Sequence, residues 1–224
     1  MNYLCIDIGT GSIKAAEKAA DGQVLRWGIL EKTDGSLQSS IQPLNESLAI
    51  HYLKTLIAEM RAESIDAVVS LPAFEVFTAV APAVDPQYIP MSPNTFKLEA
   101  FPINDKNFFL VAVPKDVIAK YKRIIRYSGL NLIHLELESI AAARVFVDLK
   151  EPVLIMDIGR RSTAFTVAEK GRVNFLSHTD FALASNARNV IINKARVLAN
   201  QKKAKRIVLA PKFAVVNGLY RVSQ

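Results

Sequence analysis

Residues 5–17 read CIDIGTGSIKAAE, and residues 155–167 read IMDIGRRSTAFTV. Each stretch runs from an apolar strand pattern into Asp-Ile-Gly, then through a turn of small, polar or basic residues into a second strand pattern. A pattern that recurs at such a distance indicates internal duplication. The sequence therefore predicts two similar halves, each opening with a tight β-hairpin.

The segments around these hairpins complete an α/β pattern in both halves. In the first half, Asn45 is placed to cap a helix, and Gly129 is placed to end a later one. The predicted first-half elements are strands at 2–8, 12–19, 23–32, 67–71 and 131–137, and helices at 45–61, 115–127 and 139–149. The second half predicts strands at 152–157, 162–168, 172–178 and 206–210, a long helix at 183–203, and a short final helix.

Residues 72–114 have a different texture, with closely spaced prolines and short β-type runs. Because proline is confined to edges and bends of sheets, this favours a small inserted β subdomain. The predicted domains are 1–65 with 115–149 as the first lobe, 66–114 as the insert, and 150–224 as a reduced second lobe.

Composition excludes several protein classes. The chain has 224 residues, of which 50% are hydrophobic and 22% charged, enough to bury a sizeable core. No apolar run approaches the roughly 18 residues of a membrane span. The start MNYLCIDIG lacks a basic leader, so we expect no secretory signal and a cytosolic protein. Cys5 lies within the first apolar run, where we expect a buried, unreactive thiol.

The net charge of +7 is concentrated late in the chain, since nine Lys or Arg and no Asp or Glu follow Asp180. Such a cluster could bind anionic lipid, an acidic partner or nucleic acid, or it could be a solvated helix end. Nucleic acid is the weakest of these readings, because no aromatic stacking pattern accompanies the charges. The centre of the basic patch is Lys202, Lys203, Lys205 and Arg206.

The paired Asp-Ile-Gly motifs have a chemical reason to occur together. Glycine at a bend lets backbone N–H groups approach a polyphosphate, and an aspartate at the strand end can hold Mg²⁺ through water. The motifs resemble those of the actin, sugar-kinase and heat-shock chaperone superfamily. The resemblance implies duplicated actin-like (ribonuclease H-like) lobes that bind ATP or ADP with Mg²⁺. The implied phosphate and magnesium residues are Asp7, Gly9, Thr10, Gly11, Ser12, Lys14, Asp157, Gly159 and Thr163, with Asp7 and Asp157 facing the metal through water.

Longer segments resemble the PilM family of type IV pilus assembly proteins, and GspL and FtsA are near alternatives. The resemblance is carried by VVSLPAFEVFTAV at 68–80, QYIPMSP at 87–93, FFLVAVPKDVIAKY at 108–121 and SGLNLIHLELESIAAARV at 128–145. It implies a cytoplasmic scaffold beneath the inner membrane that grips the N-terminal tail of a bitopic PilN-like protein and assembles into a ring or filament. A groove between the first lobe and its insert would hold this tail. Phe74, Tyr88 and Ile89 are candidates to line the groove, or they form the insert's own core.

Three features depart from this family or remain open. The second-half subdomain of the family is absent, which would leave a nucleotide more exposed. Pro211, Lys212 and Phe213 replace the family's glycines before AVVNGL, which contains Gly218, and this argues against ordinary adenosine docking. Glu138 matches the position that polarises attacking water in relatives, or is a helix N-terminal acid favoured by the dipole. The roles of Arg160 and Arg161 at the second turn stay undecided.

The sequence thus predicts a scaffold with weak or degenerate nucleotide binding and no efficient catalysis. An active Mg-ATPase that switches the same assembly is the alternative. A small-molecule kinase is remote, because we find neither a second large substrate domain nor a catalytic aspartate in a suitable motif.

Overall fold

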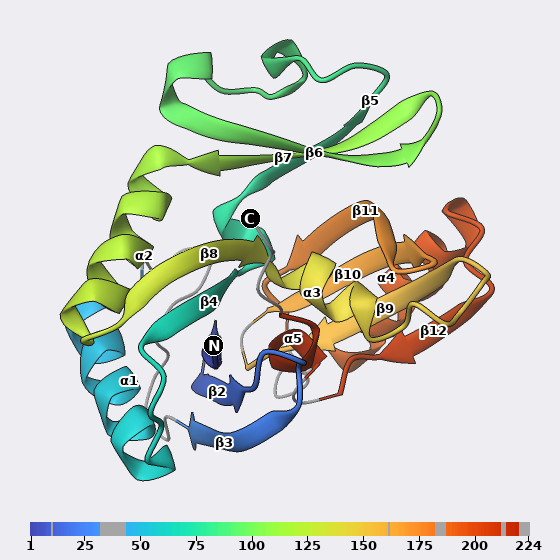
Figure 1. Cartoon of the computed structure of the whole chain (residues 1–224). Coiled ribbons are helices and arrows are strands. Elements are labelled where there is room, and N and C mark those ends of the chain that lie inside the picture. The colour runs from blue at the N-terminus through green and yellow to red at the C-terminus, as the bar shows by residue number, and fades with distance from the viewer. Residues whose placement is uncertain (10, 32–43, 161, 182–186, 212–213, 220–224) are drawn as a thin grey trace.

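The structure is a computed structural model of the chain and describes residues 1–9, 11–31, 44–160, 162–181, 187–211 and 214–219. Its elements form two lobes side by side, with a small third sheet above the first (Figure 1). Among the described residues, none of the helices combines the length and apolar character that crossing a membrane requires.

The first lobe is built on a five-stranded sheet of order β3-β2-β1-β4-β8, in which β1, β4 and β8 are parallel. Its strands are β1 (Tyr3–Ile8), β2 (Ser12–Lys18), β3 (Val24–Glu31), β4 (Asp66–Leu71) and β8 (Asn131–Leu137). Helices α1 (Glu46–Met60) and α2 (Lys115–Tyr127) pack their buried residues into the core with this sheet. As predicted, the Asn45 side chain caps α1 by accepting the N–H of Leu48.

The second lobe repeats this plan with fewer elements. Its four-stranded sheet has the order β11-β10-β9-β12, formed by β9 (Val153–Ile158), β10 (Thr163–Glu169), β11 (Arg172–Thr179) and β12 (Arg206–Leu209). Helix α4 (Arg188–Gln201) packs on one face through Ile191, Ala195 and Leu198. In both lobes the first three strands form an antiparallel meander, and the fourth lies parallel to the first. The predicted duplication is therefore present in the topology.

The third sheet, of order β5-β7-β6, is the β-rich insert. It comprises β5 (Phe77–Ala81), β6 (Phe96–Asn104) and β7 (Asn107–Pro114), with the short 3₁₀ helices η1 (Ala73–Glu75), η2 (Pro86–Tyr88) and η3 (Pro93–Thr95) between them. The predicted start of the insert at residue 66 is wrong, because β4 lies inside the first sheet, paired with β1 and β8. The insert therefore begins after Leu71.

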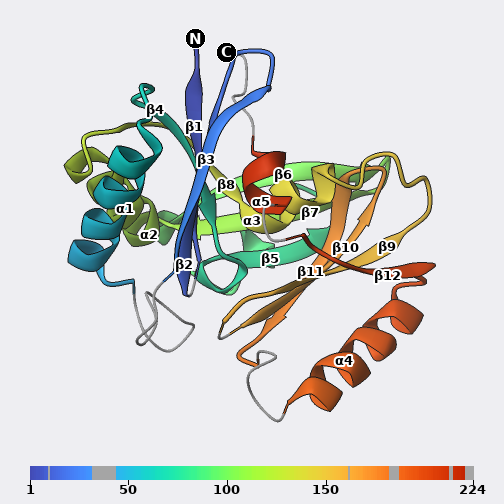
Figure 2. The same cartoon turned by 90° about the horizontal axis from the view of Figure 1, so that it is seen from below.

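Two helices cross between the lobes, and each completes the other lobe. Helix α3 (Glu138–Arg144) follows β8 but lies against β10 and β11, and helix α5 (Ala214–Gly218) follows β12 but lies against β1 and β2. Figure 2 shows the two helices near the middle of the molecule, with α4 on the outer side of the second lobe. The predicted helix at 139–149 is shorter than expected, because residues 145–148 form turns.

Polar side chains hold the end of α5 against the first lobe. The Lys18 ammonium donates to the carbonyls of Asn217 and Leu219 at 2.8 and 3.0 Å, and one Arg144 nitrogen donates to the carbonyl of Gly218 at 3.0 Å. The fully buried Cys5 thiol donates to the Leu219 carbonyl, and burial raises its pKa to about 12. The predicted burial of Cys5 is confirmed, and the raised pKa disfavours the reactive thiolate.

Candidate functional site

The two Asp-Ile-Gly bends have the same backbone geometry. The Gly9 N–H donates to the Ser12 carbonyl at 2.9 Å, and the Gly159 N–H donates to the Ser162 carbonyl at 2.8 Å. The bends also touch, because a Cβ added to Gly11 would lie 2.4 Å from Cδ of Arg160. The two turns therefore face each other across a single cleft, and a side chain at position 11 would have to displace the Arg160 side chain.

This cleft has a volume of about 510 Å³. It brings together most of the residues predicted to bind phosphate, and it adds Glu31 and Ala210, which the sequence motifs do not mark. Its lining consists of Gly9, Gly11, Ser12, Lys14, Glu31, Asp157, Ile158, Gly159, Arg160 and Ala210. Thr10 and Arg161 lie outside the described residues.

Lys14 is the central cation of the site. Its ammonium donates to one Asp7 carboxylate oxygen at 2.8 Å, and the Ser70 hydroxyl donates to the other at 2.7 Å. Asp7 and Lys14 are register partners on β1 and β2, so the hairpin itself places them together. Burial lowers the pKa of Lys14, but the charges of Asp7, Asp157 and Glu138 outweigh it and the net pKa is raised. Lys14 is therefore held charged.

Two further carboxyl groups approach the same point. Burial, with the charges of Asp157 and Asp7, raises the pKa of Glu138 to about 8. Burial, with the charge of Asp7, raises the pKa of Asp157 to about 6. One Glu138 oxygen accepts the N–H of Ala73 at 2.8 Å, which ties the start of α3 to η1. The site thus carries more potential negative charge than Lys14 alone offsets.

The raised pKa of Glu138 predicts a pH-dependent stability. A carboxyl whose pKa is higher in the folded than in the unfolded state stabilises the fold fully at pH values below its unfolded-state pKa. That contribution is lost as the pH rises toward the folded-state pKa of about 8. We expect Glu138→Gln to raise the unfolding free energy by about 2 kcal/mol at about pH 8.5, or Tm by roughly 6 °C, with no gain at about pH 4.5.

Thermal unfolding of both proteins across this pH range checks the expectation. Glu151 is exposed, so Glu151→Gln is the matched control and should not change the pH profile. A Glu138→Gln profile parallel to that of the unchanged protein would show that Glu138 does not titrate as described.

Two predicted site residues have other roles in the fold. Thr163 is fully buried, and its hydroxyl donates to the Phe181 carbonyl at 2.7 Å. It is the register partner of Ile158 and so lies on the opposite face of the sheet from Asp157. Gly218 lies in α5 against α3, where an added Cβ would fall 1.7 Å from the Ala141 carbonyl oxygen. Its missing side chain serves the packing of two helices.

The segment expected to be a degenerate adenosine motif is described only in part. Lys212 and Phe213 lie outside the described residues. Pro211 is exposed beyond β12, and its carbonyl accepts the N–H of Ala214 at the start of α5. The neighbouring Ala210 lines the cleft, so this segment does reach the site.

The basic patch lies away from the cleft. Lys202, Lys203 and Lys205 form the turn before β12, and Arg206 begins the strand, whereas the cleft meets the far end of β12 at Ala210. All four side chains are exposed, and the Lys202 ammonium lies 4.1 Å from the centre of the Phe175 ring. The patch therefore does not contribute to the cleft between the two bends.

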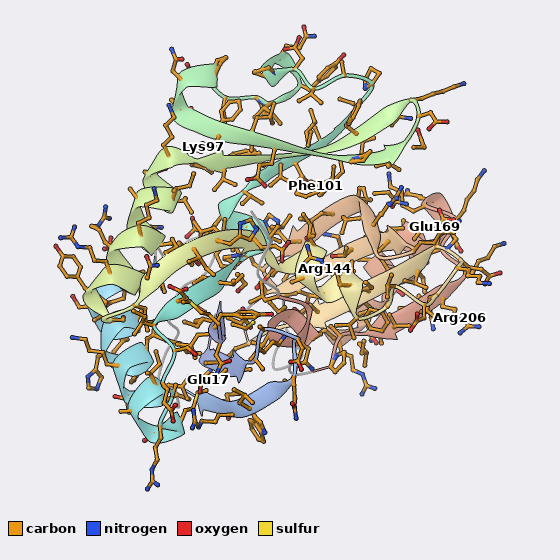
Figure 3. The ribbon with its side chains drawn as sticks, in the orientation of Figure 1. Glu17, Lys97, Phe101, Arg144, Glu169 and Arg206 are labelled. Carbon is orange, nitrogen blue, oxygen red and sulfur yellow. The ribbon has the colours of Figure 1, made fainter. Side chains whose placement is uncertain are left out.

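A second concave surface lies between the insert and the first lobe. This groove, with a volume of about 540 Å³, is bounded by the third sheet, α2 and the edge strand β8. Figure 3 labels Lys97 and Phe101 on β6 and Arg144 on α3, all of which line it. The other lining residues are Leu71, Glu99, Val111, Val113, Ile118, Lys122, Leu132, Ile133, His134, Leu135, Glu136, Leu137 and Ile140.

The residues predicted to line a partner groove lie elsewhere. Ile89 is buried in the core of the insert with Phe96 and Leu110. Tyr88 is 38% exposed, and the Phe74 ring makes an edge contact with His178 of the second lobe. For Ile89, the alternative prediction is confirmed, since this side chain belongs to the insert's own core.

Comparison with known proteins identifies the fold. No protein-family model matches the sequence, and no curated protein matches it. Among solved structures, the chain is similar to one from a PilM–PilN type IV pilus biogenesis complex, with a TM-score of 0.75, 14% identity and 97% of each chain covered. It is also similar to a protein of actin-like ATPase fold and unknown function from Bacteroides thetaiotaomicron, with a TM-score of 0.58, 6% identity, and 98% of this chain and 96% of that one covered.

A third similarity is to the cytoplasmic domain of EpsL, an inner-membrane component of the type II secretion system of Vibrio cholerae. Its TM-score is 0.56 at 10% identity, with 80% of this chain and 71% of that one covered. The twin bends and these similarities define a two-lobed protein of actin-like ATPase fold, as the sequence predicts. Its resemblance in shape to the chain from the PilM–PilN complex extends over almost its whole length.

Proposed function

We propose that the chain is a cytoplasmic scaffold of a type IV pilus or related secretion assembly, located at the inner membrane, that binds the N-terminal peptide of a PilN-like protein. The observation that carries this proposal is the groove beside β8. Residues Leu132 to Leu137 line it one after another, so the edge of the strand, and not one face of it, is turned to the groove. Such an edge can pair with an extended peptide.

The walls of the groove suit a peptide that carries both apolar and acidic side chains. Phe101, Val111 and Val113 share one face of the third sheet, as the register of β6 and β7 requires, and offer apolar contact. Lys97 and Lys122 are exposed at the rim, where they would favour acidic side chains or a carboxylate. The PilM–PilN structure supports the proposal because a chain of that complex shares this fold.

The test is a fluorescence-anisotropy titration of a synthetic N-terminal cytoplasmic peptide of a PilN-type protein. Phe101→Ala should weaken binding roughly tenfold, because it removes an aromatic anchor from the groove. Phe77 pairs with Ala112, so it lies on the opposite face of the third sheet, and Phe77→Ala is the matched control. Equal affinity of both variants would rule out this groove as the peptide site.

We further propose that the twin-bend cleft binds a polyphosphate, ATP or ADP, weakly. Lys14 and the backbone N–H groups of the bends would contact the phosphates. In the described part of the chain, no three His, Cys, Asp or Glu side chains are close enough to hold a metal ion by themselves. The excess carboxylate charge fits Mg²⁺ held by Asp7 and Asp157 through water, where the ion would neutralise the phosphates.

The scaffold would assemble with copies of itself in a ring or filament.

The protonation of Glu138 favours the scaffold over the ATPase alternative. With a pKa of about 8, this carboxyl is mostly protonated near neutral pH, so only a minor fraction of the protein carries a Glu138 carboxylate that could accept a proton from water. The Mg-ATPase switch would require a bound cation to lower that pKa again. Measurable Mg-ATP hydrolysis by the purified chain with its partner, lost in Glu138→Gln, would favour the switch.

A further inference from the structure

The duplicated lobes allow β12 to be matched residue by residue with β4. In the first lobe, Leu4 pairs with Ala67, and Ile6 pairs with Val69. In the second lobe, Leu154 pairs with Ile207, and Met156 pairs with Leu209. Because Asp7 and Asp157 occupy the same place in the two hairpins, Ile207 is the counterpart of Ala67 and Leu209 that of Val69.

The counterparts differ sharply in burial. Ala67 and Val69 are fully buried, because β8 pairs with the outer side of β4 and α2 packs into the same core. Within the described residues, β12 ends its sheet, with no strand on its outer side. Ile207 is 45% exposed and Leu209 is 64% exposed. In the described part of the chain, the second lobe therefore has no counterpart of β8 or α2, and β12 lies on its outer side (Figures 1 and 2).

The charge around β12 indicates what could occupy this edge. Arg206 begins the strand, and Lys202, Lys203 and Lys205 precede it, all exposed. A second copy would bring the same basic cluster on a chain of net charge +7. An acidic segment would instead be attracted to it. Since β8 runs parallel to β4, the equivalent strand would run parallel to β12 and place its N-terminal end beside Arg206.

We propose that β12 is a docking edge for an extended segment of another protein, which adds to the second sheet as a parallel strand. The segment carries acidic residues at its N-terminal end, against Lys205 and Arg206. Apolar residues at alternate positions follow, and these cover Ile207 and Leu209. The main chain of β12 forms the hydrogen bonds to the segment. The basic cluster sets the orientation of the segment along β12 and selects for acidic residues. This edge is separate from the groove at β8, so the proposal does not depend on the function of that groove.

The probe is a synthetic peptide in which Asp-Glu precedes the sequence of β8, Asn-Leu-Ile-His-Leu-Glu-Leu. Titrated into the ¹⁵N-labelled full chain, it should shift the amide signals of β12. The double variant Ile207→Thr, Leu209→Thr should weaken binding about tenfold, because exposed apolar area is no longer covered. Lys205→Glu with Arg206→Glu should weaken it to a similar extent and should favour a peptide led by Lys-Lys instead.

Leu25→Thr is the matched control, because Leu25 is 44% exposed on β3, an edge strand of the first sheet. It should leave peptide binding unchanged, and thermal unfolding should show that all variants remain folded. Equal binding by the Ile207→Thr, Leu209→Thr variant, or equal binding of the peptides led by acidic and basic residues, would overturn the proposal. Protection of the β12 amides in the absence of peptide would also overturn it. Protection that depends on protein concentration would show that a second copy occupies the edge, and protection that does not would show that another part of this chain does.

Discussion

Replacing Gly218 by alanine is expected to lower the free energy of unfolding by about 3 kcal/mol, or Tm by roughly 9 °C. The added Cβ would lie 1.7 Å from the Ala141 carbonyl oxygen and 2.4 Å from its carbonyl carbon. Backbone atoms of α3 cannot rotate away as a side chain could, so α5 must move. Its movement would loosen the buried contacts of Val215, Val216 and Leu219.

The neighbouring Asn217 provides the control. It lies in the same helix with its side chain exposed, so Asn217→Ala should be neutral or slightly stabilising. Denaturant unfolding followed by circular dichroism measures both variants. If Gly218→Ala were as stable as Asn217→Ala, the close approach of α3 and α5 described above would be wrong.

The second large effect is expected at Lys14. Lys14→Met removes the cation from Asp7, whose side chain is only 5% exposed, and from the two carboxyl groups beside it. Loss of one partner of a largely buried pair should cost about 3 kcal/mol at about pH 8. The cost should shrink toward about pH 5, because Asp157 and Glu138, with pKa values of about 6 and about 8, then hold protons. Binding of Mg-ATP should be lost at the same time.

Lys120 provides a control that separates the loss of a single ion pair from the loss of a cation surrounded by several acids. It forms an ion pair with Glu75 at 3.1 Å, and the two side chains are 16% and 14% exposed. Lys120→Met therefore removes a similar pair. Glu46 also interacts with Lys120, but the Arg123 side chain lowers the pKa of Glu46, so the cost should not change between about pH 6 and pH 8. Urea unfolding at several pH values and calorimetric titration with Mg-ATP provide both readouts. If the stability cost of Lys14→Met did not change with pH, the interaction of Lys14 with Asp157 and Glu138 would be contradicted.

The sequence predicted the fold well where local patterns set it. Alternating apolar residues and the bends at Gly9 and Gly159 give two hairpins, and their repetition along the chain gives the duplication. The assignment of residues 66–71 to the insert failed because a strand's sheet partners lie far away in sequence. β4 pairs with β1 and β8, and nothing within the strand itself identifies those neighbours.

The site was only partly predictable for a related reason. Asp7, Lys14 and Asp157 were found because motif spacing fixes their places on the hairpins. The hairpin register could have corrected Thr163, because Asp157 pairs with Ala164, and Thr163, one residue before Ala164, must point to the other face. Ser70, which donates to Asp7, and the role of Gly218 depend on contacts between distant segments. No local signal marks such residues.

The exchange of α3 and α5 between the lobes has a consequence for synthesis of the chain on the ribosome. Tyr3, Cys5 and Ala16 are covered by α5, whose residues are translated about two hundred positions later. Until those residues emerge, the nascent first lobe exposes an apolar sheet face that other nascent chains or chaperones can bind. Pausing of translation before residue 214 would therefore prolong the most aggregation-prone stage in the life of this protein.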